Sequence, residues 1–138
     1  MTPDTQATLL EIYRRERLSF LQYVGQATPY ADPADRPMRD RVLELAHAEA
    51  ARLDEFGDYL EQHHVTLPRV GAFPTAFTNY NFVAVRKLVP DLVADERRGL
   101  QSLQHDAAAL PEGPFRTLVQ ELAAAKQTRL NELEKLPQ

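Results

Sequence analysis

The sequence predicts an all-α protein, an antiparallel bundle of four helices formed by residues 1–138 as one domain. Apolar residues recur at three- and four-residue spacing along four long segments, which is the period of a helix with one buried face. Proline-containing stretches separate these segments, and no segment alternates apolar and polar residues as a strand does. Four helices with one apolar stripe each bury those stripes most simply against one another.

The first two helices are expected over residues 4–27 and 36–64. Their stripes consist of Leu9, Ile12, Phe20 and Tyr23, and of Met38, Val42, Leu45, Leu53, Phe56 and Leu60. Pro29 ends the first helix, because the residue before a proline is disfavoured in the helical conformation. The intervening stretch 30–37 contains two prolines and two aspartates, which is typical of a loop that ends in a helix cap.

The last two helices are expected over residues 76–108 and 114–136. Their stripes consist of Val85, Val89, Leu92, Leu100 and Leu103, and of Phe115, Leu118, Val119, Leu122, Leu130 and Leu133. Residues 65–75 form the long connection that precedes them. Pro90 lies inside the third helix and is expected to kink it or to split it into two segments.

The composition excludes several classes of function. The net charge of −4 argues against a nucleic-acid-binding surface. Without cysteine the chain has no disulfide, no zinc–thiolate site, no iron–sulfur cluster and no thiol nucleophile. It has no glycine-rich phosphate loop and no Gly-x-Ser-x-Gly motif. It also has no signal peptide and no apolar run of membrane-spanning length, so a cytoplasmic protein without a membrane partner is expected.

Four charged residues interrupt the apolar stripes, one in each predicted helix. They are Glu16, Glu49, Glu96 and Lys126, and each has apolar residues four positions before and after it. They also stand at similar distances along the chain from the connections at the bundle's ends. If the helices are straight, the four side chains therefore meet at one level of the core.

Three carboxylates in an apolar core require a compensating cation, because burial and mutual repulsion both oppose their ionisation. One solution is a metal ion, and oxygen-rich ligation suits iron or manganese better than zinc or copper. The other solution is a buried salt-bridge network that fixes the register of the helices. Its cations would come from Lys126 together with an arginine nearby: Arg17, Arg52, Arg97 or Arg129.

A second constellation lies on the second predicted helix, where Glu44-Leu-Ala-His47 places a carboxylate and an imidazole on one face. With its four helices, long middle connection and inward glutamates, the chain resembles the ferritin-like superfamily. The resemblance implies Glu16 or Glu11 as the ligand on the first helix, Glu44 and His47 on the second, and Glu96 on the third. His47 can equally be a half-buried helix residue without a ligand role.

The candidate metal ligands are therefore Glu16, Glu44, His47, Glu49 and Glu96, and iron or manganese is the expected metal. The fourth helix departs from the pattern of the superfamily. Its nearest match to a second Glu-x-x-His is Glu121-Leu-Ala-Ala124, which has no histidine. No efficient oxygen chemistry is expected for this reason, and no catalytic residue is identified.

The segment 73–82 concentrates aromatic residues: Phe73, Phe77, Tyr80 and Phe82. It is either a strap packed over the bundle or a surface for a homodimer or another protein partner, since aromatic residues are favoured at interfaces. The second functional hypothesis is accordingly a metal-free scaffold that dimerises or binds a partner through this segment. The metal hypothesis requires the three stripe glutamates to converge, whereas the scaffold hypothesis requires Lys126 or an arginine at their centre.

Overall fold

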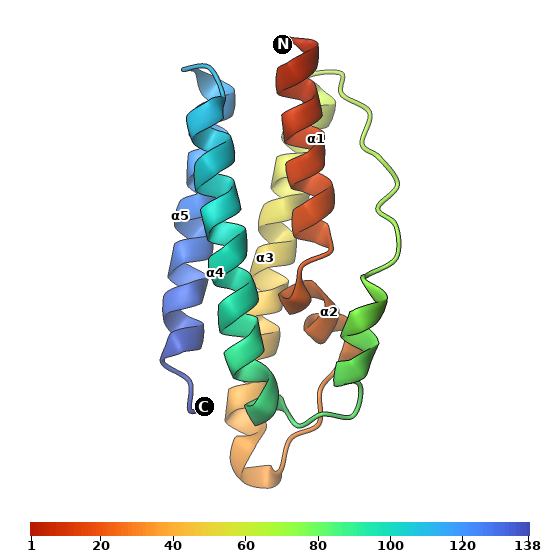
Figure 1. The fold of residues 1–138 in the computed structure, drawn as a ribbon, viewed down its shortest axis with the longest axis vertical. Coiled ribbons are helices and arrows are strands. Elements are labelled where there is room, and N and C mark those ends of the chain that lie inside the picture. Colours follow the sequence, from red (N-terminus) through yellow and green to blue (C-terminus); the bar gives the residue numbers. More distant parts are fainter.

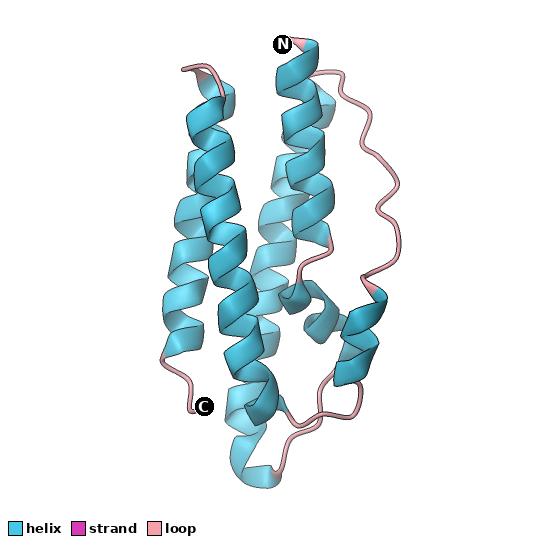
Figure 2. Cartoon of the chain, viewed as in Figure 1, coloured by secondary structure: helices cyan, strands magenta, loops and turns pink.

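The computed structural model describes residues 1–138 and is all-helical, which confirms the all-α prediction (Figure 2). Its five α-helices are α1 (Pro3–Arg17), α2 (Phe20–Ala27), α3 (Arg36–Gln62), α4 (Val85–Ala109) and α5 (Pro114–Glu134). Two short 3-10 helices, η1 (Pro33–Asp35) and η2 (Thr75–Tyr80), lie in the connections. None of the helices combines the length and the apolar character that crossing a membrane requires.

The four long helices α1, α3, α4 and α5 lie lengthwise along the molecule (Figure 1). Helices α1 and α5 run in one direction, and α3 and α4 run in the other. The connection between α3 and α4, residues 63–84, therefore returns along the whole length of the molecule. The chain thus consists of two helical halves, α1 to α3 and α4 to α5, which are joined by this connection.

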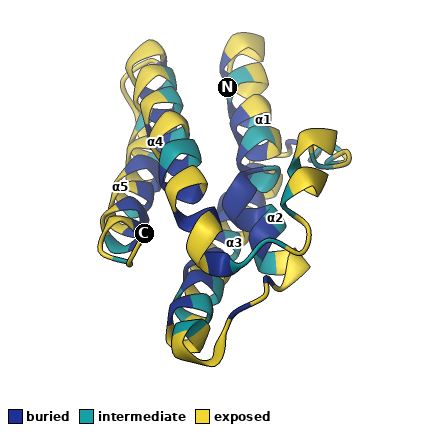
Figure 3. Cartoon of the chain, turned by 60° about the horizontal axis from the view of Figure 1, so that its bottom comes forward, coloured by how far each residue is buried: buried dark blue, intermediate teal, exposed yellow.

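The apolar stripes face inward and form a continuous core (Figure 3). The apolar residues without any exposed surface come from all four long helices and from α2: Leu9, Ile12, Leu21, Val42, Leu60, Val85, Val89, Leu92, Leu103, Val119 and Leu133. Burial of each such side chain contributes about 1.5–3 kcal/mol relative to exposure. This burial is the main favourable term that holds the helices together.

The predicted helix 4–27 is in fact two helices, because Ser19 interrupts it. Ser19 adopts an extended conformation (φ −63°, ψ 157°) and its Oγ accepts a hydrogen bond from the Gln22 N–H at 3.2 Å. Serine favours this capping geometry over a helix interior, where its hydroxyl competes with the backbone. The break allows α2 to pack on α3, where Gln22 Nε2 donates to the carbonyl oxygen of Ala46 at 2.9 Å.

The predicted third helix begins later than its pattern indicated, at Val85 rather than at residue 76. Residues 75–80 form η2 instead, and Phe82 then takes a left-handed conformation (φ 67°) that no helix can continue through. The Val85 N–H donates to the carbonyl oxygen of Tyr30 at 2.8 Å and so ties the start of α4 to the first loop. Pro90 does not split α4, which continues from Val85 to Ala109 with the proline inside it.

The contact between α2 and α3 is close enough to exclude a side chain at Gly25. A Cβ added there would lie 2.7 Å from the Cβ of Ala46, below the range of normal contacts. We predict that Gly25→Ala lowers the free energy of unfolding, because overpacking costs about 1–3 kcal/mol and outweighs a gain of about 1 kcal/mol in helix propensity.

Urea denaturation followed by circular dichroism measures this change. Gly71→Ala is the matched control, since a Cβ at Gly71 meets no atom within 4 Å. An unfolding midpoint of Gly25→Ala at or above that of the wild type would show that α2 can move away from α3 at little cost.

Candidate functional site

A cluster of five buried charged side chains lies at one level between the four long helices. Lys126 on α5 places its Nζ at the centre. The distances from this atom to the nearest carboxylate oxygens are 2.9 Å for Glu16, 3.2 Å for Glu96 and 3.3 Å for Glu49. None of these four residues is more than 4% exposed. The prediction that the four stripe-interrupting residues meet in the core is therefore confirmed.

Arg129, one helical turn after Lys126, supplies the second cation of the charge cluster. Its Nη2 lies 3.2 Å from Glu49 Oε2, and its Nε lies 3.8 Å from Glu96 Oε2. The other arginines that the sequence offered lie elsewhere. Arg17 pairs with Asp54 at the surface, and Arg97 pairs with Glu134 there. Both buried cations thus come from one face of α5, and the half-buried Arg15 of α1 approaches Glu16 Oε2 to 3.9 Å from the edge of the cluster.

Glu49 also accepts hydrogen bonds from two polar residues of the α1–α2 region that sequence reasoning missed. Ser19 Oγ donates to Glu49 Oε1 at 2.7 Å, and Gln22 Nε2 donates to the same oxygen at 3.1 Å. Ser19 can donate its hydroxyl proton while its oxygen caps α2, so the break in the helix and the charge cluster depend on the same side chain. The available sequence signal was a pair of polar residues beside the apolar residues Phe20 and Leu21.

Burial and neighbouring charges both shift the pKa values of the cluster, and which of the two prevails differs from residue to residue. Burial raises the pKa of Glu96 to about 8, and the neighbouring charge of Glu49 adds to this effect. Burial also raises the pKa of Glu16. Burial opposes the charge on Glu49, but Lys126 and Arg129 more than offset this and hold the pKa of Glu49 below its ordinary value. Burial likewise opposes the charge on Lys126, yet the carboxylates raise the pKa of Lys126.

These shifts indicate how the charge cluster reaches neutrality. Lys126 and Arg129 balance two of the three carboxyl groups, and Arg15 Nε lies 3.9 Å from Glu16 at the edge of the cluster. Glu96 and Glu16 are the two groups whose surroundings favour a retained proton. Glu96 Oε2 is buried without a hydrogen-bond partner, as is Arg129 Nε. Arg129 Nε lies 3.8 Å from that oxygen, which is too far for a hydrogen bond, so the cost of burying a charged Glu96 is only partly compensated.

The remaining predicted ligands do not join the cluster. Glu44 and His47 are exposed on α3, and Glu44 Oε2 pairs with Arg41 Nη1 at 2.9 Å. Glu11 is exposed on α1 and pairs with Arg14 at 2.6 Å. The structure contains no group of three or more histidine, aspartate or glutamate side chains placed to hold a metal ion. A metal role for Glu16, Glu49 and Glu96 stays a prediction.

The aromatic segment 73–82 packs mainly against α2. The ring centroid of Phe73 lies 5.3 Å from that of Tyr23. The ring centroids of Phe77 and Tyr80 lie 5.0 and 4.7 Å from that of Phe20. Phe82 differs from these three, because its side chain is fully exposed.

Comparison of the chain with known proteins gives no further assignment. No family model, no curated protein and no solved structure matches it. The chemistry of the site is therefore inferred from its own residues.

The charge cluster predicts a large effect for the loss of its central cation. Lys126→Met leaves three carboxyl groups without the ammonium at their centre, and breaking a buried ion pair in this way costs about 3–5 kcal/mol. We expect urea denaturation at pH 7 to show a loss of this size. Lys135→Met removes an exposed lysine that pairs with Glu132 at 3.3 Å and should cost less than about 1 kcal/mol. Equal losses in the two variants would contradict a structural role for the cluster.

Protonation of Glu96 predicts a pH-dependent stability. The folded state binds this proton more tightly than the unfolded chain, because the pKa rises from its ordinary 4.5 to about 8. Between these pH values the folded state holds more protons, so its stability falls as pH rises, by at most about 1.4 kcal/mol per pH unit from this group. Glu96→Gln removes this pH-dependent contribution to the free energy of unfolding, because glutamine does not titrate.

Urea denaturation of both proteins at pH 5, 6, 7 and 8 tests this expectation. The stability of Glu96→Gln relative to the wild type should increase steadily with pH. A difference between the two that stays constant across the series would mean that Glu96 is ionised throughout.

Proposed function

We propose that this chain is a ferritin-like bundle of four helices that works without a bound metal, and that its function is binding, at the surface around the aromatic segment 73–82, rather than catalysis. Supporting the bundle topology, α1 and α3 form one antiparallel pair and α4 and α5 form another (Figure 1). A long connection between the pairs is also the feature on which the resemblance to ferritin-like proteins rests.

The observation that carries the metal-free proposal is the position of Lys126 Nζ, within 3.3 Å of carboxylates from three helices. In di-iron bundles two helices each give a glutamate, and the other two each give a Glu-x-x-His pair. Here α1, α3 and α4 each give an inward glutamate. Helix α5 gives Lys126 and Arg129, which have the spacing of a Glu-x-x-His pair but carry positive charge.

An ammonium fixed at the centre of three carboxylates performs the electrostatic task that a metal ion performs in such bundles. A divalent cation entering the charge cluster would meet Lys126 and Arg129 at close range, and both repel it. The cluster thereby fixes the register of the helices, which is the best supported role of buried ion pairs. It also offers no access to a substrate, since Lys126 is 1% exposed and Arg129 is 7% exposed.

A binding role at the aromatic segment is supported by what this end of the molecule exposes. Phe82 is 100% exposed and Tyr30 is 58% exposed, and both border the same cleft. Large exposed aromatic side chains gathered in one place are typical of interaction sites. The rings of Phe73, Phe77 and Tyr80 pack on aromatic residues of α2, which fixes the segment that carries Phe82.

Metal content measured by mass spectrometry tests the proposal. Tag-free protein loaded with iron(II) or manganese(II) and then desalted should retain no stoichiometric metal. The double variant K126E/R129H places a Glu-x-x-His pair at the inward positions of α5 and should retain metal, with an unfolding temperature that rises when the metal is added. Adding Glu49→Ala to this double variant should abolish both effects.

The opposite result in the wild type would overturn the metal-free proposal. One or more equivalents of metal, retained by the wild type and lost in Glu49→Ala or Glu96→Ala, would establish an iron or manganese site among the buried carboxylates. The binding role rests on the exposed aromatic side chains and would be tested separately.

A further inference from the structure

A cleft of about 710 Å³ opens beside the aromatic segment, between α2, the loop that follows it and the start of α3. Its size is typical of clefts that bind small organic molecules. Aromatic side chains supply much of its wall, including Tyr23, Tyr30, Phe73 and Phe82. The cleft therefore offers flat apolar surfaces on more than one side.

The charged residues of this wall are all positive. Arg36 and Arg39 line the cleft, whereas no aspartate or glutamate does. Arg36 forms no ion pair, because the neighbouring Asp35 pairs with Arg86 at 2.7 Å. Arg39 Nε is buried without a hydrogen-bond partner, and its nearest carboxylate oxygen is that of Asp40 at 3.6 Å. Both guanidinium groups thus retain donors for an anion.

The position of these arginines on α3 strengthens the positive field. Both stand in the first turn of the helix, where the helix dipole already favours negative charge and opposes cations. The turn itself contains no acidic residue, and of the two aspartates that flank it, Asp35 pairs with Arg86 and Asp40 lies 3.6 Å from Arg39. Two arginines at this place weaken the helix slightly, and an anion bound in the cleft would reverse the effect.

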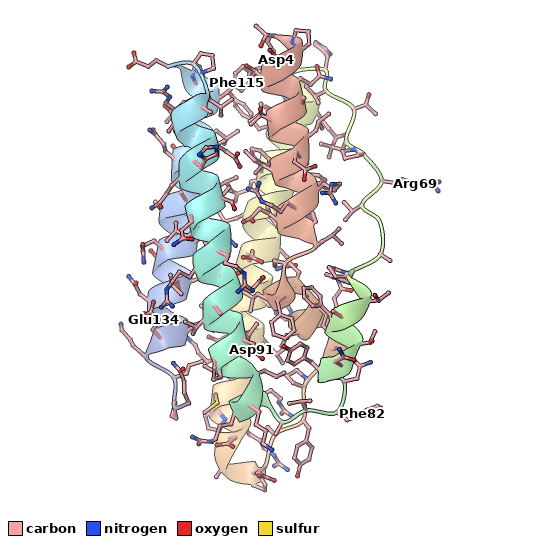
Figure 4. The ribbon with its side chains drawn as sticks, viewed as in Figure 1. Asp4, Arg69, Phe82, Asp91, Phe115 and Glu134 are labelled. Carbon is pink, nitrogen blue, oxygen red and sulfur yellow. The ribbon has the colours of Figure 1, made fainter.

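The rim of the cleft is held in an uncommon backbone conformation. Thr28 (φ 50°) and Phe82 (φ 67°) are both left-handed, which is sparsely populated for residues that have a Cβ. The hydrogen bond from the Val85 N–H to Tyr30 O joins the two loops that carry them. As a result the ring of Phe82 projects from the body of the molecule rather than packing on it (Figure 4).

We propose that this cleft binds a small amphipathic anion, a molecule with an aromatic or aliphatic body and one carboxylate, sulfonate or phosphate group. The body lies among the aromatic side chains, with the exposed ring of Phe82 at the rim. The anionic group lies at the start of α3, where Arg36 and Arg39 donate charge-assisted hydrogen bonds to it. This ligand class specifies the binding role proposed above and rests on it.

Fluorescence titration with a matched pair of probes tests the assignment. The probes are 8-anilinonaphthalene-1-sulfonate and N-phenyl-1-naphthylamine, which share an aromatic body and differ in the sulfonate. The wild type should bind the sulfonate saturably, at one site per chain, and decanoate should displace it. The variant R36A/R39A should bind the sulfonate about 10- to 100-fold more weakly but the uncharged probe equally well.

Three control measurements accompany the titration. Arg69→Ala removes an exposed, unpaired arginine of the long connection outside the cleft and should leave both probes unaffected (Figure 4). Phe82→Ala should weaken the binding of both probes, because it removes an aromatic ring from the rim of the cleft beside their shared body. Circular dichroism must show that every variant is folded, since anilinonaphthalene probes also bind partly unfolded proteins.

Binding of the sulfonate that is unsaturable, or unchanged in R36A/R39A, would overturn the assignment. So would a concentration-dependent dimer that Phe82→Ala abolishes, because a second copy of the chain would then be the occupant of the cleft. Metal content measured on the same preparations reports on the metal-free proposal separately, so that a failure of either idea can be recognised by itself.

Discussion

The contact between the ammonium of Lys126 and the carboxylates of Glu16, Glu49 and Glu96 constrains the whole structure. Each carboxylate belongs to a different long helix, so all three helices must present one residue at the same level and on the face that looks toward α5. An apolar stripe tolerates rotation or sliding by a turn at modest cost, since one leucine can replace another. A charge displaced from its partner in the core is far more costly, and the cluster therefore selects one register among several that the stripes would allow.

Helix α2 connects this cluster with the aromatic surface. At its first turn Ser19 and Gln22 donate hydrogen bonds to Glu49, and between them Phe20 faces the rings of η2. Tyr23, one residue further, lines the cleft and contacts Phe73. The first turn of the short helix is thus fixed by hydrogen bonds to the buried carboxylate of Glu49, and its next residues form part of the wall of the cleft. The buried cluster therefore fixes the position of α2, and α2 in turn fixes the position of the surface proposed for binding.

The sequence is most informative where a residue violates a strong pattern. A glutamate between two apolar residues at four-residue spacing has few alternatives to burial, so the pattern alone places Glu16, Glu49, Glu96 and Lys126 together. The Glu-x-x-His motif at Glu44 misleads for the opposite reason. Two residues three apart share a face of any helix, but the motif does not say whether that face is inward, and here it is exposed. The break at Ser19 has no such signal, because apolar periodicity continues across it and the hydroxyl is satisfied by Glu49, a partner 30 residues away.

The long connection divides the charge of the cluster unequally. The part of the chain before it contributes Glu16 and Glu49, and the part after it contributes Glu96, Lys126 and Arg129. During synthesis the first part leaves the ribosome with two carboxylates on its future core face and without Lys126 and Arg129, the two buried cations. Its own cation near these carboxylates is the half-buried Arg15, whose Nε lies 3.9 Å from Glu16 Oε2. That face cannot dehydrate favourably until α5, made after the other four helices, supplies Lys126 and Arg129. We therefore expect closure of the core to be coupled to the synthesis of α5, and a chain that lacks this helix to be more accessible to proteases.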